Sequence, residues 1–185
     1  MTHGFWKDLP NPIFALAPMH DVTDAAFRNI IAKYGKPDVF YTEFASTEAL
    51  MSEKGQSKVM HYLKFSEVEH PIVAQVFGAK SEKFYETTKL VASLGFDGID
   101  INMGCPDKSI EKQGAGAAHM KNWRRAQEVI RAAQEGAGDI PVSVKTRIGY
   151  NKVEFMEWLP KILECGVPAL TVHLRTRKEM SLVPA

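Results

Sequence analysis

The sequence predicts an α/β fold, a (β/α)8 TIM barrel that is truncated after about six strands. Short runs rich in β-branched and aromatic residues alternate with segments of helical spacing, at roughly 30 residues per unit, which is typical of βαβ units in a parallel sheet. Polar or reactive side chains also stand at the C-terminal end of almost every run. A barrel carries its active site at that end, so both observations favour the same fold.

The expected strands are short apolar runs that end at polar residues or turn formers, and they cover residues 13–19, 39–44, 71–78, 98–104, 141–149 and 169–176. The helices expected between them cover residues 23–35, 81–95, 123–138 and 153–166. In the first helix, Phe27, Ile30, Ile31 and Tyr34 form one apolar face, and Gly35 is the expected C-terminal cap. We expect Ser81 to be the N-cap of the second helix, Gly95 to end it, and Pro160 to kink the fourth.

A doubly wound open sheet is the alternative closure of the same units. A dinucleotide-binding open sheet normally has a G-x-G-x-x-G motif after an early strand, and none occurs there. The barrel interpretation requires about eight strands in about 250 residues, whereas the chain has 185 residues and stops just after the sixth run. We therefore expect residues 1–185 to be one incomplete barrel domain, the N-terminal part of a longer protein.

The composition is that of a folded soluble protein, with 45% hydrophobic and 24% charged residues and a net charge of +1. Bulk charge does not indicate a nucleic-acid binder, so any such function must depend on a local site. The two cysteines, Cys105 and Cys165, lie far apart without zinc-like spacing, and we expect no metal. Neither a signal peptide nor an apolar run of the ~20 residues that span a membrane is present. These features predict a cytoplasmic protein with reduced thiols, and they leave its oligomeric state unknown.

Cys105 lies between Gly104 and Pro106, just past an expected strand. An unpaired cysteine is commonly a small buried hydrophobe, and that interpretation stays open. Its place in a loop at the active face of the barrel equally indicates a catalytic thiol. Cys165 lies inside an amphipathic helix, where a structural role is expected.

Several polar side chains are expected to face the inside of the barrel. Lys145 and Arg147 are two residues apart on one strand, so they share a face. They either meet an anion or a polar ring there, or extend into solvent at the strand end. His173 and Arg175 repeat the spacing on the next strand, and Gln75 is an amide among apolar neighbours that needs partners.

At this level of detail the sequence resembles the tRNA-dihydrouridine synthases, which are flavin enzymes with a (β/α)8 barrel followed by a small helical domain. The matching segments are "LAPMHDVTDAAFR" at 16–28, "AQVFG" at 74–78, "GIDINMGCP" at 98–106, "KQGAGAA" at 112–118, "VKTRIG" at 144–149 and "TVHLRTR" at 171–177. They span almost the whole chain in the order of the family, and their combination is specific.

The resemblance implies a function and a set of site residues. Family members reduce the carbon 5–6 double bond of uridine in tRNA: NADPH (or NADH) reduces FMN, the flavin gives hydride to carbon 6, and a cysteine gives a proton to carbon 5. Cys105 matches that cysteine. The positions around FMN are matched by Pro18, Met19, Gln75, Lys145 and His173, and those near the target uracil by Asn102 and Arg147, with Arg175 as a further expected substrate contact.

Two departures from the family pattern accompany the match. Leu174 follows His173 where the family commonly has glycine. The segments that bind the FMN phosphate and the helical tRNA-binding domain are expected outside this chain, so the fragment alone is expected to bind flavin and tRNA poorly. Two alternatives remain: another FMN barrel such as a dihydroorotate-dehydrogenase-like enzyme, or a non-catalytic remnant that acts as an interaction module.

Overall fold

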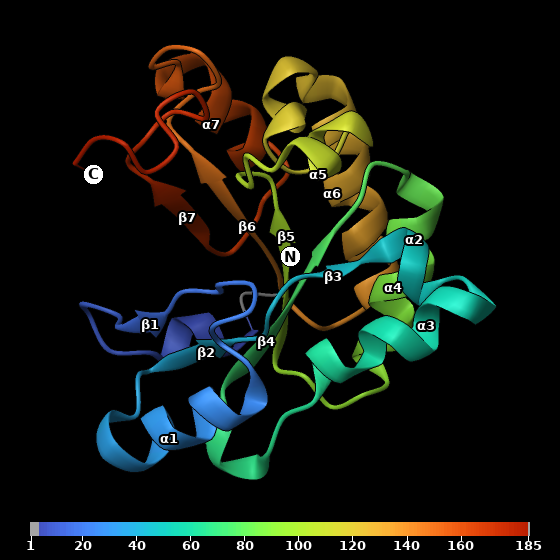
Figure 1. The fold of residues 1–185 in the computed structure, drawn as a ribbon, viewed down its shortest axis with the longest axis vertical. Helices are drawn as coiled ribbons and strands as arrows, with labels where there is room; N and C mark the ends of the chain where they lie inside the picture. Colours follow the sequence, from blue (N-terminus) through green and yellow to red (C-terminus); the bar gives the residue numbers. More distant parts are fainter. Residues whose placement is uncertain (1–3, 185) are drawn as a thin grey trace.

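The computed structural model describes residues 4–184, whose strands form one parallel sheet in the order β1-β2-β4-β5-β6-β7, with β3 beside β4 (Figure 1). The strands are β1 (Ala15–Leu16), β2 (Val39–Tyr41), β3 (Ala45–Ser46), β4 (Ile72–Phe77), β5 (Gly98–Asn102), β6 (Val142–Arg147) and β7 (Leu170–His173). Apart from β3, each strand pairs with the next one along the chain, and the order never reverses. A doubly wound sheet would reverse at a switch point, so the half-barrel expected of an incomplete (β/α)8 fold is confirmed.

All six expected strands are present, but they are shorter than predicted. The segment 39–44 was expected as one strand, whereas β2 ends at Tyr41 and a separate strand, β3, begins at Ala45. The last expected strand, 169–176, stops at His173 because the backbone turns there, and the N–H of Arg175 donates to the carbonyl of His173 at 2.8 Å. β4 and β5 are buried along almost their whole length, as strands covered on both faces must be.

The helices are α1 (Ala25–Gly35), α2 (Thr47–Leu50), α3 (Glu53–Val59), α4 (Ser81–Ala92), α5 (Lys108–Lys112), α6 (Trp123–Ala137) and α7 (Phe155–Leu163). Short 3-10 helices are η1 (Gly4–Asp8), η2 (Met60–Leu63), η3 (Glu67–Glu69) and η4 (Gly116–Lys121). The sequence predicted α1, α4, α6 and α7 and missed the short helices, which have too few turns for a periodic apolar face.

Three details of the predicted helices were wrong. Ser81 is the first residue of α4 and Lys80 is its N-cap, while Gly35 is the last residue of α1 and Lys36 its C-cap. The apolar face of α1 is only partly covered, because the side chains of Ile30 and Tyr34 are exposed. A fourth difference is the end of α4, which lies at Ala92 with Ser93 as the C-cap, whereas Gly95, the expected end, follows with a φ of 87°.

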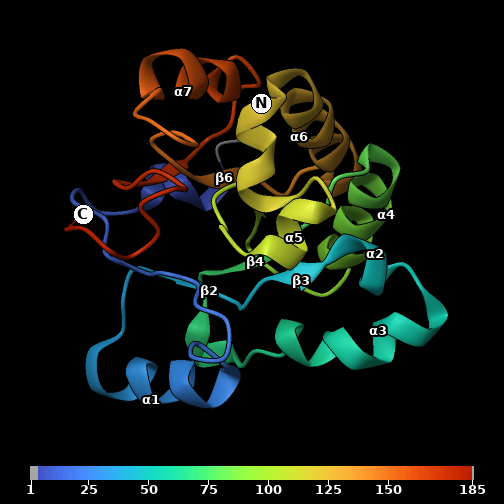
Figure 2. The same ribbon diagram turned by 45° about the horizontal axis from the view of Figure 1, so that its top comes forward.

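The main hydrophobic core lies between the sheet and the helices outside it. Figure 2 shows α4 and α6 side by side on this outer layer, where they pack against each other. Phe84 and Val91 of α4 meet Val129 and Ile130 of α6 in the core, and all four are fully buried. Cys165, after α7, is buried in the same core, which agrees with its predicted structural role.

A second, smaller core closes the half-barrel interior at the end opposite the C-terminal ends of the strands. Val39, Tyr41 and Val73 are buried there against Phe5 and Trp6 of η1, together with Leu9. With this end filled by apolar side chains, polar groups in the interior lie towards the C-terminal ends of the strands. No helix among residues 4–184 has the length and apolar character that crossing a membrane requires.

Candidate active site

The strand register brings the polar side chains of the interior into adjacent positions. Asp100 of β5 pairs with Gln75 of β4 on one side and with Ser143 of β6 on the other. One step further along the strands, Asn102 pairs with Lys145, and Lys145 pairs with Thr171. Arg147 pairs with His173. Because alternate residues of a strand share a face, these side chains form one polar wall.

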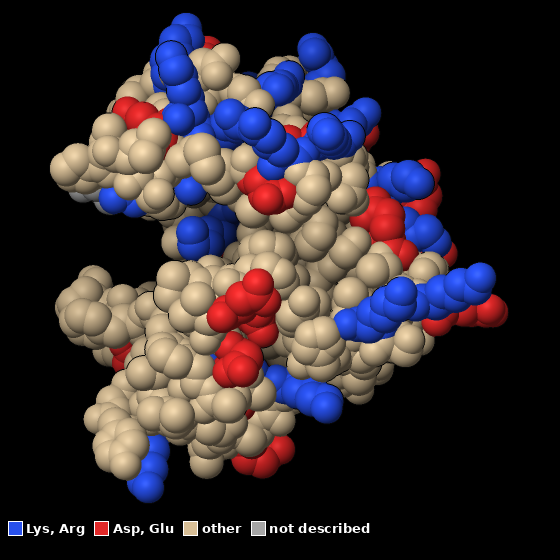
Figure 3. Space-filling model, in the orientation of Figure 1, with Lys and Arg blue, Asp and Glu red and all other residues tan. Residues whose placement is uncertain are grey.

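This wall lines a cavity of about 550 Å³ at the C-terminal ends of the strands. Figure 3 shows the molecule hollowed on this side, with Lys and Arg side chains inside the hollow. The lining residues are Ala17, Pro18, Met19, His20, Phe44, Gln75, Asn102, Gly104, Cys105, Lys145, Arg147, Thr171, Val172 and His173. Of the nine residues that the sequence predicted for the site, this list contains all but Arg175.

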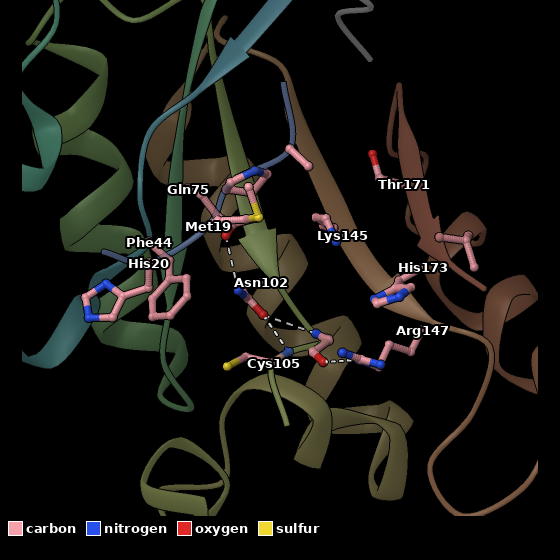
Figure 4. A pocket seen from close by; sticks show the side chains of 14 residues that line it. Met19, His20, Phe44, Gln75, Asn102, Cys105, Lys145, Arg147, Thr171 and His173 are labelled. Atoms are coloured by element: carbon pink, nitrogen blue, oxygen red, sulfur yellow. Dashed lines mark hydrogen bonds between the residues drawn. The ribbon is translucent and has the colours of Figure 1, made fainter. Parts of the chain in front are cut away.

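Lys145 projects into the cavity (Figure 4), and its ammonium group makes no hydrogen bond or ion pair with any residue of the described range 4–184. Burial lowers the pKa of this ammonium group, and the carboxylate of Asp100 opposes that effect. A partly buried cation without a partner is costly unless a ligand supplies one. The inward orientation predicted from strand parity is confirmed.

The two amides of the wall are bonded to each other. Asn102 donates from Nδ2 to Oε1 of Gln75 at 3.1 Å, and Gln75 donates from Nε2 to Oδ2 of Asp100 at 2.7 Å. The side chain of Asn102 also accepts, through Oδ1, the backbone N–H of Cys105 at 2.9 Å. Asn102 therefore holds the turn that carries the cysteine.

Cys105 is partly buried at the edge of the cavity. Burial raises the pKa of its thiol, so the group is protonated at neutral pH. In Figure 4 its sulfur points towards Phe44 and His20 and away from Lys145 and His173. Cys105 therefore lines the same cavity as Lys145 and Arg147, but its sulfur faces the opposite end of that cavity.

The sulfur end of this cavity adjoins a second one of about 530 Å³, which is also lined by His20, Phe44 and Cys105. The His20 ring stacks on Phe44 with ring centroids 5.0 Å apart, and the ring centroids of His20 and Tyr62 are 5.3 Å apart. Cys105 thus stands where a cationic cavity and an aromatic one meet.

Gly104 is required before the cysteine for space and not for an unusual φ. A Cβ built at this position would lie 3.2 Å from the backbone of Thr146 on β6. The carbonyl of Gly104 also accepts a hydrogen bond of 2.8 Å from Nε of Arg147. The close approach of the turn to β6 explains why a glycine stands here.

Arg147 is 7% exposed and is largely engaged by the protein itself. Besides the bond to Gly104, its Nη1 donates to the carbonyls of Thr176 and Met180 at 3.2 and 3.1 Å. Only Nη2 is without a partner among the described residues, so Arg147 ties two loops together and keeps one amino group for a ligand.

His173 ends β7, and Arg175 lies beyond the strand, outside the cavity lining. The predicted repeat of two inward side chains on this strand is therefore wrong for Arg175. Arg175 instead donates from Nη1 to Nε2 of His173 at 3.1 Å. Burial together with the charges of Arg147, Lys145 and Arg175 lowers the pKa of His173 to about 4, so the ring is neutral.

The comparison with known proteins is specific. Residues 15–185 match the family model described as dihydrouridine synthase (Dus). The chain belongs to the dihydrouridine synthase family. It is similar to the "Probable tRNA-dihydrouridine synthase" of Staphylococcus aureus strain Mu50, at 47% identity over 186 residues that cover 100% of this chain and 56% of that protein. It is also 48% identical over 186 residues to the "Probable tRNA-dihydrouridine synthase 2" of Bacillus subtilis strain 168, of which it covers 57%. The chain thus spans little more than half the length of these relatives.

In this member of the dihydrouridine synthase family, sequence reasoning missed part of the wall. Asp100, Ser143 and Thr171 share the strand parity of Asn102, Lys145 and His173, so parity alone placed them on the inner face. Their role was overlooked because they lie before the strand ends, Asp100 and Thr171 two residues before the last inward residue of their strands and Ser143 four residues before it. Phe44 and His20 were missed because loop residues follow no period.

One group of side chains in the described part of the chain has metal-ligating chemistry. His20, Asp21 and Glu43 can each offer an atom within 4.8 Å of the others. Glu43 already accepts the backbone N–H of Asp21 at 2.7 Å, and Nδ1 of His20 lies 3.6 Å from the same oxygen of Glu43. One carboxylate oxygen of Glu43, Oε1, is thus engaged by the protein itself.

Proposed function

We propose that the protein carrying these residues is a tRNA-dihydrouridine synthase, which saturates the carbon 5–6 bond of a uridine in tRNA. The observation that carries the proposal is a protonated thiol, Cys105, at the edge of the cavity that Lys145 and His173 line, in a chain of the dihydrouridine synthase family. Reduction of an alkene needs a hydride and a proton, and this site has a proton donor but no hydride source of its own. A cofactor must supply the hydride.

FMN fits the residues of the larger cavity. Its volume of about 550 Å³ lies in the range of small-molecule sites. One wall offers an unpartnered cation, Lys145, while Pro18 and Met19 offer apolar contact on another. Gln75 and Asn102 each keep a second amide N–H for the carbonyl oxygens of a flavin or a uracil. When bound, the flavin, reduced by NADPH or NADH, supplies the hydride for carbon 6.

The remaining chemistry belongs to side chains of the protein. Cys105 donates the proton to carbon 5, which its raised pKa favours because the thiol must hold its proton until the transfer. Lys145 stabilises negative charge that develops beside it. The neutral ring of His173 is bonded at Nε2, so Nδ1 carries its proton and serves as a donor.

The orientation of the sulfur restricts where the base binds. Since Cys105 faces Phe44 and His20, the uracil ring has to lie at the junction of the two cavities to receive its proton. A base can reach that position only after leaving its stack in the RNA. Asn102 and the free Nη2 of Arg147 are the expected uracil contacts, and Arg175 acts through His173. Such an enzyme works on tRNA in the cytoplasm.

The test measures flavin binding and product in the intact protein that carries these residues. Visible absorbance shows whether FMN binds, and mass spectrometry of digested nucleosides shows whether unmodified tRNA gains dihydrouridine with NADPH. Parallel reactions with dihydroorotate and with free uridine distinguish a dihydroorotate-dehydrogenase-like enzyme. A protein that stays colourless with FMN and forms no dihydrouridine would be the non-catalytic module.

A further inference from the structure

We propose that Asp100 is a positioning residue of this site, which acts on Cys105 through Gln75 and Asn102. The inference rests on the proposed function in one respect, that Cys105 is the working thiol. Asp100 itself lies below the cavity and is absent from its lining, so it is no catalytic residue.

Asp100 is completely buried, and both of its carboxylate oxygens are used. Oδ1 accepts the hydroxyl of Ser143 at 2.7 Å, and Oδ2 accepts Nε2 of Gln75 at 2.7 Å. Gln75 is completely buried as well. These contacts join β4, β5 and β6 at one level of the half-barrel. The next level towards the C-terminal ends of the strands contains Asn102 and Lys145.

The chemistry of the carboxylate dictates which way each amide points. An ionised carboxylate only accepts, so Gln75 has to turn its NH2 group towards Asp100 and its oxygen towards Asn102. Asn102 then has to present its own NH2 group to Gln75, which leaves its oxygen for the turn beyond β5. A reversed amide at either position would set two donors or two acceptors against each other.

The hydrogen bonds at the Cys105 end require the same orientation of the Asn102 amide. Oδ1 of Asn102 accepts the backbone N–H groups of Gly104 and Cys105 at 3.2 and 2.9 Å. Backbone N–H groups are donors only, so they need the oxygen of Asn102 and not its nitrogen. A carboxylate at one end and two N–H groups at the other thus fix a single arrangement, and the cysteine backbone is part of it.

Few titratable groups lie near Asp100. Lys145 from β6 and Tyr41 from β2 are the titratable groups that influence it, and Lys145 is the only nearby cation among them. Among residues 4–184, the side-chain hydrogen bonds of the Asp100 carboxylate come from Gln75 and Ser143, and neither Lys145 nor Tyr41 is bonded to it. Its placement is explained by the amides that it orients.

The decisive experiment compares substitutions of two buried glutamines that have different hydrogen-bond partners. Gln75→Met breaks the chain of bonds between Asp100 and Asn102. Gln127→Met is the matched control, because Gln127 is also buried and bonded through Nε2, to the carbonyl of Lys161 and to Glu164 in the outer helix layer. The measurement is the alkylation rate of Cys105 by iodoacetamide, resolved by peptide mass spectrometry and divided by the rate for the same cysteine in denaturant.

We expect Gln75→Met to raise the rate about tenfold over wild type, since the variant loses two buried hydrogen bonds, one of which holds the Asn102 amide that fixes the turn. Gln127→Met should stay within about twofold of wild type. Equal rates in the two variants, or a fall in Gln75→Met, would overturn the proposal. Alkylation requires neither flavin nor tRNA, so its outcome is independent of whether dihydrouridine is formed.

Two substitutions of Asp100 distinguish its role as a hydrogen-bond acceptor from its role in filling space. Asp100→Asn keeps an acceptor for Gln75, whereas Asp100→Leu has none. We expect the Cys105 rate of Asp100→Asn to stay near wild type and that of Asp100→Leu, where it folds, to rise as in Gln75→Met. A rise of equal size in both Asp100 variants would contradict a role through the acceptor oxygen.

Discussion

Arg175 donates a hydrogen bond from Nη1 to Nε2 of His173 at 3.1 Å, and this bond determines the state of the imidazole. A guanidinium only donates, so the ring nitrogen that receives it has to be unprotonated. The proton of the neutral ring therefore resides on Nδ1. Burial, followed by the charges of Arg147, Lys145 and Arg175, keeps the pKa of His173 at about 4.

Replacing Arg175 with Met should move the pKa of His173 from about 4 towards its ordinary value of 6.5. The sign follows from the charge, because removing a cation favours the protonated ring. A depressed histidine pKa contributes stability above about pH 6.5 that is lost as the pH falls towards 4, and the variant should lose less of it. Imidazole NMR titration measures the shift. His119, whose pKa burial lowers to about 4, is the internal control and should not move.

Lys145→Met should weaken FMN binding about tenfold to a hundredfold, because a hydrogen bond from a charged group contributes about 1.5–3 kcal/mol. Fluorescence titration with FMN gives the affinity. Lys108→Met is the matched control, since Lys108 is an exposed lysine on the nearby helix α5. Equal affinities in the two variants would mean that Lys145 serves no ligand.

Cys105→Ala should lower the rate of dihydrouridine formation about 10²- to 10⁴-fold, which is the usual contribution of a general acid. Reduction of the flavin by NADPH should be almost unchanged, since that step needs no proton from Cys105. Stopped-flow absorbance and nucleoside mass spectrometry follow the two steps. Cys165→Ala removes the other thiol from the outer core and should leave both rates near wild type. Normal product from Cys105→Ala would remove the thiol from the mechanism.

Arg147→Met should lower the free energy of unfolding by about 2–4 kcal/mol, because three carbonyl groups lose a donor in a mostly buried place. The segment from Thr176 to Met180 should also become sensitive to limited proteolysis, since two of those carbonyls belong to it. Chemical denaturation and peptide mapping measure the two effects. Unchanged stability would mean that Arg147 serves the substrate and not the loops.

Strand parity predicted the inward side chains of the strands, whereas the loop residues Pro18 and Met19 were predicted from the family resemblance, and Cys105 from that resemblance together with its place in a loop. Lys145 and Arg147 share a face because alternate residues of a strand do, and Val142 and Val144 of the opposite parity are buried in the outer core. Parity says which face a side chain occupies, but it gives no partner. The engagement of Arg147 with two loops and the direction of the Cys105 sulfur depend on tertiary contacts, which no local pattern encodes.

Strand ends and loops account for the remaining errors. The run "ALTVHLRT" looks continuous, yet the backbone turns after His173 and takes Arg175 out of the cavity. The run "VFYTEF" likewise divides: β2 ends at Tyr41, Thr42 keeps one backbone hydrogen bond to Val73 of β4, and β3 begins only at Ala45. In both cases side-chain composition favoured a longer strand than the available backbone partners allow.

Asp100→Asn should change how stability depends on pH. Burial raises the pKa of Asp100 from 3.8 to about 6, although Gln75, Ser143 and Lys145 act against the rise. The folded state therefore holds this proton more tightly than the unfolded state, so the Asp100 contribution to stability falls as the pH rises from about 4 to about 6 and stays low above that range. A shift of this size corresponds to about 3 kcal/mol.

Asparagine cannot ionise, so the variant should lack that decline. Relative to wild type, its free energy of unfolding in urea should therefore be larger near neutral pH than near pH 4 by about 3 kcal/mol. Asp107→Asn is a control of opposite sign, because hydrogen bonds from Ser109 lower the pKa of Asp107 and its contribution is lost as the pH falls. If wild type and Asp100→Asn lose stability in parallel across the range, the buried carboxylate titrates normally. If the variant gains stability as expected, the native protein retains a destabilising charge beneath its cavity, which is the expected consequence of keeping an acceptor-only group to orient Gln75.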